Sequence, residues 1–296
     1  MLSGTDGQDH GSDGRLLREV LDVRPLPERE DVFAGANLPH WRPRLFGGQV
    51  LGQAAVAAGR TVPAERLLHS MHAYFLRPGD PDVPVELSVE RLRDGRSFSA
   101  RRVQALQDGA PILSGIASFQ VPAEGLDHAR PAPDVPGPEG LPSDAELLEA
   151  LDHPAARLMA RARPVELRHV EEAIYAAPAA ERREEQSVWV RLPAGLADDP
   201  LLHQAGLAFL SDVTVLEPVL RRHGLPWGTP GMSVASLDHA IWWHRPARAD
   251  EWLLHVTASP SASGARGLAT GWIYDEQRRL VATVAQEGMV RLPQGS

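Results

Sequence analysis

The sequence predicts an α+β protein in which one long helix, wrapped by a strongly bent antiparallel sheet, occurs twice. Three observations lead to this prediction. Two regions carry the period-2 alternation of half-buried strands, their patterns repeat at a fixed spacing, and a single helix pattern precedes each strand set. A Pro-rich stretch, residues 130–142, separates the two regions and reads as a linker.

The strand patterns are clearest in the first region. Apolar and polar residues alternate over 83–92 and 97–106, and Asp94-Gly95 and Asp108-Gly109 are strong hairpin signals. In the second region we expect the corresponding turns at 261–264 and 275–278. The sheet of each half is therefore predicted to be antiparallel.

The repeat rests on spacing more than on identity. Arg77-Pro78 falls on Arg245-Pro246 at an offset of 168 residues, and the same offset places 112–119 on 280–287. Gln107-Asp108-Gly109 likewise falls on 275–277. Each region thus reads as an apolar strand ending in Arg-Pro, followed by two strands, a polar turn and a last strand.

The helix candidates are residues 47–62 and 200–224. Alanines favour helix in the first, and its glycines would permit close packing against a sheet. In the second, apolar residues recur at helical spacing (202, 205, 209, 213 and 216), and Gly224 is a plausible stop. Within the connection between the halves, Ser143 to Glu146 forms a capping box before a short helix that we expect to break near Pro154.

We therefore divide the chain into a disordered tail (1–13), a first half (14–121), a Pro-rich linker with a short helix (122–163) and a second half (164–292). The length of 296 residues, with 43% hydrophobic and 23% charged residues, is that of a globular protein. The net charge of -9 argues against general nucleic-acid binding, which needs a basic face. A local basic patch could still bind a phosphorylated ligand.

The chain has no cysteine, which excludes disulfides, thiolate metal sites and a cysteine nucleophile and fits a reducing compartment. It has no apolar run near the ~20 residues that span a bilayer. Its polar, Gly-rich N-terminus reads as neither signal peptide nor anchor, and its C-terminus carries no recognisable address. We expect a cytoplasmic protein.

Several segments, in this order along the chain, resemble the type II acyl-CoA thioesterases, the TesB-like double-hotdog enzymes. They are LFGGQVLGQA (45–54), LLHSMHAYFLRPGD (67–80), RLRDGRSFSARRVQALQDG (91–109), ASFQ (117–120), HQAGLAFLSD (203–212), SLDHAIWWHRP (236–246), EWLLHVTASPSASGARGLATGWIY (251–274) and VATVAQEG (281–288). The resemblance runs from about residue 14 to 292. It implies two fused hotdog halves, hydrolysis of fatty acyl-CoA without a cofactor, and a homodimer or homotetramer.

The resemblance also implies the catalytic residues. The family activates water with an Asp, a Thr or Ser, and a Gln, which fall on Asp212, Ser236 and Gln286. Many members have Thr where this chain has Ser236, so the hydroxyl is retained with a less restricted rotamer.

The residues themselves suit this chemistry. Thioester hydrolysis needs an activated water and a stabilised oxyanion. Asp212 lies in an apolar helical pattern, so we expect it to be buried and its pKa raised toward that of a useful general base. Ser236 and Gln286 supply groups that can hold a water, and backbone N–H groups near a helix would stabilise the oxyanion. The structural alternatives are a solvated Asp in a helix and a Gln that only bonds neighbouring strands.

For the phosphates of CoA, the arginine cluster on neighbouring strands is the candidate. Arg suits phosphate because its fork bonds two oxygens. We expect contacts from the first half and, at the corresponding region of the second, from Arg266; the alternative is a solvated strand face. The candidates of the first half are Arg91, Arg93 and Arg101, with Arg96 and Arg102 beside them.

Other chemistries fit the sequence less well. The spacings of His69, His72, His239 and His244 suit neither a zinc helix motif nor one strand face, so no metal is expected. Asp238 and His239 are adjacent on a strand and should point to opposite faces. There is no Gly-x-Ser-x-Gly elbow, and residues 46–53 lack the Rossmann spacing. Trp242 and Trp243 suit a core or an interface better than a ligand platform.

Two functions compete with hydrolysis. One is a non-catalytic acyl-CoA binding or regulatory module. The other is a hotdog enoyl-CoA hydratase, although no convincing His partner follows Asp212. At the offset of 168, Gln286 meets Ser118 and Ser236 meets Leu68, so the first half lacks the polar trio. We therefore expect one active site per chain and a structural role for the first half, with acyl chain length left open.

Overall fold

The computed structural model describes residues 14–39, 44–193 and 195–293, so the predicted disordered tail lies outside the described residues. It confirms the α+β prediction: each half is a hotdog, one central helix against a curved antiparallel sheet, and the two sheets join edge to edge. The strand order is β1-β2-β4-β5-β6-β3-β10-β13-β12-β11-β8-β7, with β9 pairing to β13.

The first half contains helices α1 (Gly14–Leu21) and α2 (Gly47–Gly59), and six strands. They are β1 (Arg24–Pro25), β2 (Val32–Gly35), β3 (Leu67–Phe75), β4 (Val85–Asp94), β5 (Phe98–Gln107) and β6 (Ala110–Gln120). The linker holds a short 3-10 turn, η1 (Pro138–Gly140), and helices α3 (Asp144–Glu149) and α4 (Pro154–Ala162).

The second half contains helices α5 (Pro200–Ser211) and α6 (Glu217–His223), and seven strands. They are β7 (Glu166–His169), β8 (Glu185–Arg191), β9 (Ser233–Ser236), β10 (Asp238–Trp243), β11 (Leu253–Ser263), β12 (Arg266–Tyr274) and β13 (Leu280–Arg291).

The repeat predicted from sequence spacing is present in the strands. β11 and β12 begin 168 residues after β4 and β5. Where the two half-sheets meet, antiparallel β3 and β10 place His72 opposite Ala240, its own counterpart at this offset. A local twofold axis therefore passes through this pair and relates the halves.

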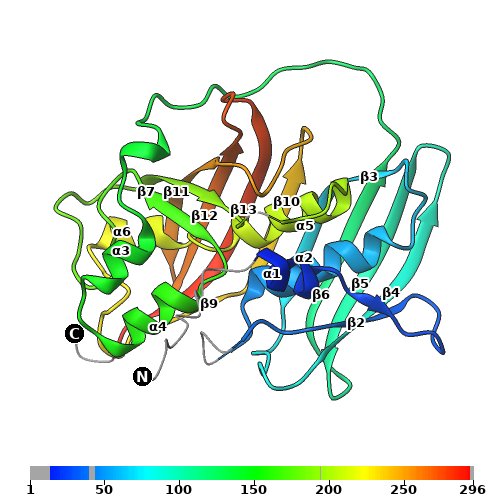
Figure 1. The fold of residues 1–296 in the computed structure, drawn as a ribbon, viewed down its shortest axis with the longest axis horizontal. Helices are drawn as coiled ribbons and strands as arrows, with labels where there is room; N and C mark the ends of the chain where they lie inside the picture. The colour runs from blue at the N-terminus through cyan, green and yellow to red at the C-terminus, as the bar shows by residue number, and fades with distance from the viewer. Residues whose placement is uncertain (1–13, 40–43, 194, 294–296) are drawn as a thin grey trace, which may run out of the picture.

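The two central helices, α2 and α5, lie side by side against the inner face of the sheet (Figure 1). Small residues allow this approach: a Cβ added at Gly48 would lie 2.5 Å from the carbonyl oxygen of Phe209, and one at Gly52 would lie 3.0 Å from that of Ala205. Close packing of the helices joins the two halves into one hydrophobic core.

The prediction of one helix over 200–224 was wrong in its middle. α5 ends at Ser211, with Asp212 as its C-cap, and α6 begins at Glu217. Pro218 prevents a continuous helix, because it lacks the N–H that would bond the carbonyl of Thr214 and its ring would clash there. The Gly224 stop is confirmed, since this residue ends α6 in the left-handed conformation.

The linker lies along the outer face of the second half-sheet and arches across the top of the molecule in Figure 1. Trp189 donates its indole N–H to the carbonyl of Pro136 (2.8 Å), and Arg278 donates to those of Pro133 and Val135. The capping box of Ser143 and Glu146 is confirmed, and Pro154 opens the next helix as expected. These contacts cover a second apolar cluster that includes Trp189 and Trp252.

The predicted turns are mostly in place. Asp108 and Gly109 both have positive φ, as a two-residue hairpin turn requires. In the second half the turn after β11 lies at Gly264-Ala265, later than the predicted 261–264, because the strand continues to Ser263.

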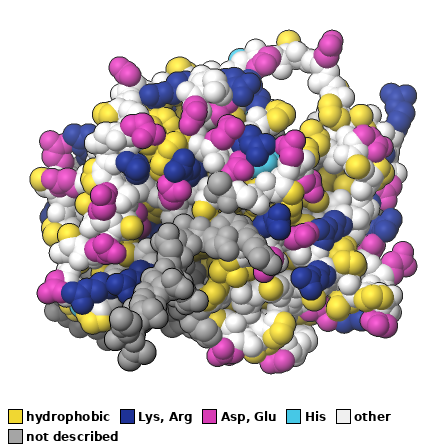
Figure 2. Space-filling view, viewed as in Figure 1, with side chains coloured by type: hydrophobic (Ala, Val, Ile, Leu, Met, Phe, Trp, Pro, Cys, Tyr) yellow, Lys and Arg dark blue, Asp and Glu magenta, His cyan; other side chains and the backbone are white. Residues whose placement is uncertain are grey.

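Charges of both signs are interspersed on the face shown in Figure 2. Within the described residues, no helix is long and apolar enough to span a membrane.

A histidine sits inside the core of the second half. His255 is fully buried, Gly271 leaves room for its ring, and neither ring nitrogen has a hydrogen-bond partner among the described residues. Burial lowers the pKa of His255 to about 3, from an ordinary 6.5. The folded state therefore binds this proton far less readily than the unfolded state.

This difference predicts acid-linked destabilisation. Between pH 6.5 and about 4 the unfolded His255 is protonated and the folded one is not, so its contribution to stability is complete above pH 6.5 and falls by about 1.4 kcal/mol per pH unit on acidification. His255→Leu should reduce the slope of unfolding free energy against pH by that amount. Urea unfolding at pH 7.5, 5.5 and 4.5 measures it, because the last two values lie inside this window; identical slopes in both proteins would contradict the prediction.

Candidate active site

Asp212 lies at the contact between the two central helices. Its position as the C-cap of α5 leaves the side chain only 9% exposed, so the predicted burial is confirmed. Its Oδ2 atom accepts a hydrogen bond from the backbone N–H of Gly48, 2.8 Å away in the first turn of α2. The N-terminus of that helix stabilises the anionic carboxylate, because unpaired N–H groups and the helix dipole point at it.

The structure brings the three predicted catalytic residues together. Gln286, on β13, donates from Nε2 to Ser236 Oγ at 2.8 Å, and Ser236, at the end of β9, lies 3.5 Å from Asp212 Oδ1. β9 pairs with β13, which holds the hydroxyl beside the amide. Three segments far apart in sequence thus form one polar row.

His239 extends this row into the core. Its Nδ1 contacts Gln286 Oε1, and its Nε2 lies 2.9 Å from Ser211 Oγ. The ring is buried, and burial lowers its pKa even though the charge of Asp212 acts in the opposite direction. His239 is therefore neutral near pH 7.

The tautomer follows from these partners. An amide oxygen only accepts, so His239 Nδ1 carries the proton and donates to Gln286 Oε1. This contact turns the amide of Gln286 so that its NH₂ group faces Ser236. Asp238, as expected, points to the other face, where its carboxylate accepts the N–H of Glu287. From the sequence, His239 was considered as a metal ligand and as a partner of Asp238, and its contact with Gln286 was not predicted.

A cavity of ≈ 570 Å³ opens beside Asp212. Its walls come from both halves, so the first half supplies more than a scaffold. They are mainly apolar and include Val50, Phe75, Val213, Leu216, Trp227 and Val234, while Asp212, Ser236 and Gln286 are among the polar residues of the lining. A mainly apolar cavity with a few convergent polar groups suits a ligand with an alkyl chain and one reactive polar centre.

Two glycines at the start of α2 leave space for the carboxylate. A Cβ on Gly47 would lie 2.8 Å from Asp212 Oδ2 and 2.9 Å from the ring of Phe75. The glycines of the FGGQ motif (46–49) are therefore required because a side chain there would collide with the Asp212 site. The sequence suggested a different reason, namely close packing of the helix against the sheet.

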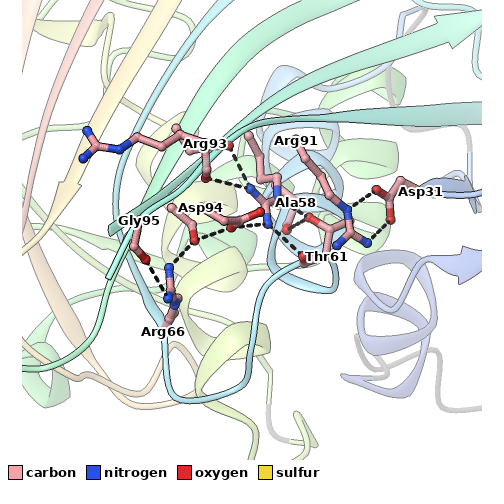
Figure 3. Close-up of polar contacts among 11 residues, drawn as sticks. Asp31, Ala58, Thr61, Arg66, Arg91, Arg93, Asp94 and Gly95 are labelled. Carbon is pink, nitrogen blue, oxygen red and sulfur yellow. Dashed lines mark hydrogen bonds and ion pairs between the residues drawn. The ribbon is translucent and has the colours of Figure 1, made fainter. Parts of the chain in front are cut away.

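The arginines expected to bind phosphate lie elsewhere. Arg101, on β5, is buried and donates to Thr61 and to Asp94, two residues that Figure 3 labels. Arg91 makes a two-bond pair with Asp31, and the Arg93 side chain points away from the cluster (Figure 3).

This cluster packs at the C-terminal end of α2, a helix about 20 Å long, whereas Asp212 contacts its N-terminal end. Arg266 pairs with Glu287 at 2.9 Å. The cavity beside Asp212 is lined by two other arginines, Arg44 and Arg77, which the sequence analysis did not single out for phosphate.

Comparisons with known proteins agree with this architecture. Residues 167–289 match the family model described as acyl-CoA thioesterase, and residues 38–120 match the acyl-CoA thioesterase N-terminal domain. The chain is 36% identical to acyl-CoA thioesterase 2 of Haemophilus influenzae, covering 93% of this chain and 98% of that protein. It is 38% identical to human acyl-coenzyme A thioesterase 8, over 97% and 95% of the two chains.

Among solved structures, an acyl-CoA thioesterase II from Mycobacterium marinum superposes with a TM-score of 0.77 at 40% identity, covering 95% of this chain and all of that one. Matches of this identity and coverage extend over both halves, the linker and the Asp212 site. The chain therefore belongs to the acyl-CoA thioesterase family.

Proposed function

We propose that this protein hydrolyses fatty acyl-CoA to a free acid and CoA at the cavity beside Asp212. The observation that carries the proposal is the row Asp212–Ser236–Gln286 on the wall of an apolar cavity. An acyl chain fits the apolar walls, and the polar row is where the thioester carbonyl and a water would meet. The family membership supports the same substrate class.

The chemistry assigns a role to each residue. Ser236 and Gln286 orient a water, and Asp212 removes its proton as the oxygen attacks the carbonyl carbon. When the tetrahedral intermediate collapses, the carbon–sulfur bond breaks and Asp212 returns the proton to the departing thiolate. The products are a carboxylic acid and a thiol, and the carboxylate is regenerated.

The oxyanion needs a donor that is in place before the reaction. Gly47 is the first residue of α2, lines the cavity, and carries an N–H that has no acceptor within the helix. Gly48 N–H already holds Asp212. We therefore assign Gly47 N–H to the oxyanion, where the helix dipole also favours negative charge.

The positioning role given to His239 leads to a testable result. His239→Phe removes the donor that orients the Gln286 amide, and we expect kcat to fall about fivefold with KM little changed, since a lost charge-free hydrogen bond is worth roughly 1 kcal/mol. Steady-state kinetics measure kcat and KM separately. His239→Gln keeps a donor and should recover part of kcat; equal losses in both variants, or a rise in KM alone, would count against positioning.

Arg77 is our candidate for the phosphates of CoA. It is exposed at the cavity, donates to the carbonyl of Pro111, and has no carboxylate partner among the described residues. Arg77→Gln should raise KM for acyl-CoA about tenfold, the cost of one charge-assisted hydrogen bond, and leave KM for the phosphate-free acyl-pantetheine unchanged. Arg91→Gln is the matched control from the predicted cluster. A larger effect of Arg91→Gln would restore the cluster as the phosphate site.

The experiment that tests the function is a thiol-release assay over a panel of acyl-CoAs. Hydrolysis predicts stoichiometric release of CoA and free acid. Tight binding without release at any chain length would instead favour a binding module, and loss of enoyl absorbance with an enoyl-CoA would favour a hydratase.

We further propose that the chain acts in the cytoplasm as a homodimer or homotetramer with one active site per chain. The family resemblance supports the assembly, and the one Asp–Ser–Gln row found among the described residues supports the count. Light scattering at micromolar concentration measures the assembly directly.

A further inference from the structure

A second cavity lies at the opposite end of α5 from Asp212. Its volume is ≈ 590 Å³, close to that of the first. It lies between the start of β3, the first turn of α5 and the segment after β10. Its lining includes Leu68, His69, His203, Gln204, Trp243 and Trp252.

The local twofold axis makes this cavity the counterpart of the one beside Asp212. Residues 75–79 line the first cavity, and 243–247, which follow at the offset of 168, line the second. The fourth residue of α2, Val50, lines the first, and the fourth of α5, His203, lines the second. The fold therefore builds the same kind of recess twice.

The hydrolytic row is missing from the second recess. At the offset of 168, Ser236 corresponds to Leu68 and Gln286 corresponds to Ser118. The Ser118 hydroxyl already forms a hydrogen bond with His69 Nε2, at 2.8 Å. The C-cap of α2 is Arg60, where α5 has Asp212, and the three carboxylates that line this recess are paired with arginines: Asp198, Glu251 and Asp275. The second recess can hold a ligand without hydrolysing it.

His203 supplies an unused donor in this wall. Its side chain is buried, with the residue 4% exposed, and its Nδ1 accepts the backbone N–H of Ala249 at 3.3 Å. Burial lowers the pKa of His203, so the ring is neutral and its one proton lies on Nε2. That N–H has no acceptor among the described residues, and a buried donor without a partner is costly. Neighbouring side chains cover this nitrogen, so a ligand carbonyl would satisfy it after a local side-chain shift.

The charges of the wall select a neutral ligand. Arg245, the counterpart of Arg77, contacts the carboxylate of Asp127, while Arg77 has no such partner in the described chain. The two other arginines of this wall, Arg248 and Arg279, are also paired with carboxylates. Each arginine that lines this wall in the described chain thus has a carboxylate partner, and the indoles and leucines of the wall suit an alkyl chain.

We propose that the second cavity is a non-catalytic binding site for an acyl chain with a neutral carbonyl head, of the thioester or amide class, held by His203 Nε2–H. The site is separate from the one proposed to hydrolyse acyl-CoA, and its occupancy does not depend on hydrolysis.

The test uses a ketone analogue of decanoyl-pantetheine in which CH₂ replaces sulfur, so that it is neutral and cannot be hydrolysed. Titration calorimetry should give two equivalents per chain, and one in Ser236→Trp, which fills the first cavity. His203→Phe should lower the affinity of the remaining site about tenfold, and His203→Gln, which keeps a donor, should retain it. Thermal unfolding checks that each variant is folded.

A crystal structure of the unmodified protein, with a ligand that carries bromine at the end of its alkyl chain, locates the ligand without any variant. Bromine in both cavities supports the proposal; bromine beside Asp212 alone, or no binding to Ser236→Trp, overturns it. If Ser236→Trp bound the corresponding CoA ketone ten times more tightly than the pantetheine ketone, the proposal of a neutral ligand would be overturned. Thiol release from acyl-CoA, assayed on the same unmodified protein, reports separately on the hydrolytic site.

Discussion

Asp212→Asn is expected to lower kcat for acyl-CoA hydrolysis by about 10³-fold, within the range for loss of a general base. The amide fits the same space, but it cannot take a proton from water. It can still accept the Gly48 N–H through its oxygen, so the fold around α2 should be kept. Thiol release at saturating substrate measures the effect, and substrate binding should change little.

The matched control is Asp199→Asn at the other end of the same helix. Asp199 caps α5 by accepting the N–H of Leu201, and Asn caps a helix equally well. This variant should keep full activity and stability. If Asp212→Asn hydrolyses acyl-CoA as fast as the control, Asp212 is not the base and the proposed mechanism is wrong.

Gly47→Ala is expected to lower kcat/KM about 10²-fold without unfolding the protein. The added methyl would lie 2.8 Å from Asp212 Oδ2, inside van der Waals contact, so the carboxylate must move. A displacement approaching 1 Å in a catalytic group can cost a factor of this size. The kinetics should be read beside a crystal structure of the variant, which shows where the carboxylate goes.

Gly59→Ala provides the same insertion at the far end of α2. There the methyl meets Leu201, and overpacking of this kind typically costs about 1–3 kcal/mol of stability. We expect a lower unfolding temperature with kcat retained. If both variants lost activity alike, α2 would tolerate no added methyl at either end. The effect of Gly47→Ala could then not be attributed to displacement of the Asp212 carboxylate.

The sequence predicted the repeat because spacing survives where identity does not: the strands of the second half begin at the predicted offset. The family resemblance also grouped Asp212, Ser236 and Gln286, each in a recognisable segment, and the structure places their side chains together. The sequence misplaced Asp212 within a helix, because apolar periodicity continues through 213 and 216 while the backbone turns there. Pro218 was the local signal for that break.

The hydrogen-bond partners of the Asp212–Ser236–Gln286 row were harder to foresee. The contact of His239 with Gln286 depends on how β10 and β13 pair, and a linear sequence does not show which inward side chains meet. The arginines illustrate the same limit. Arg91, Arg93 and Arg101 cluster in sequence, yet they lie near the opposite end of α2 from Asp212, while Arg77 reaches the cavity through the β3–β6 region.

The hydrogen bond from Gly48 to Asp212 has a consequence for how activity arises during synthesis. Donor and acceptor are 164 residues apart, one in each half, so neither half alone holds both Gly48 and Asp212. When a ribosome-bound chain has folded only its first half, the N-terminus of α2 is present but Asp212 is not yet beside it. Under the proposed mechanism, turnover therefore requires that the two halves have docked.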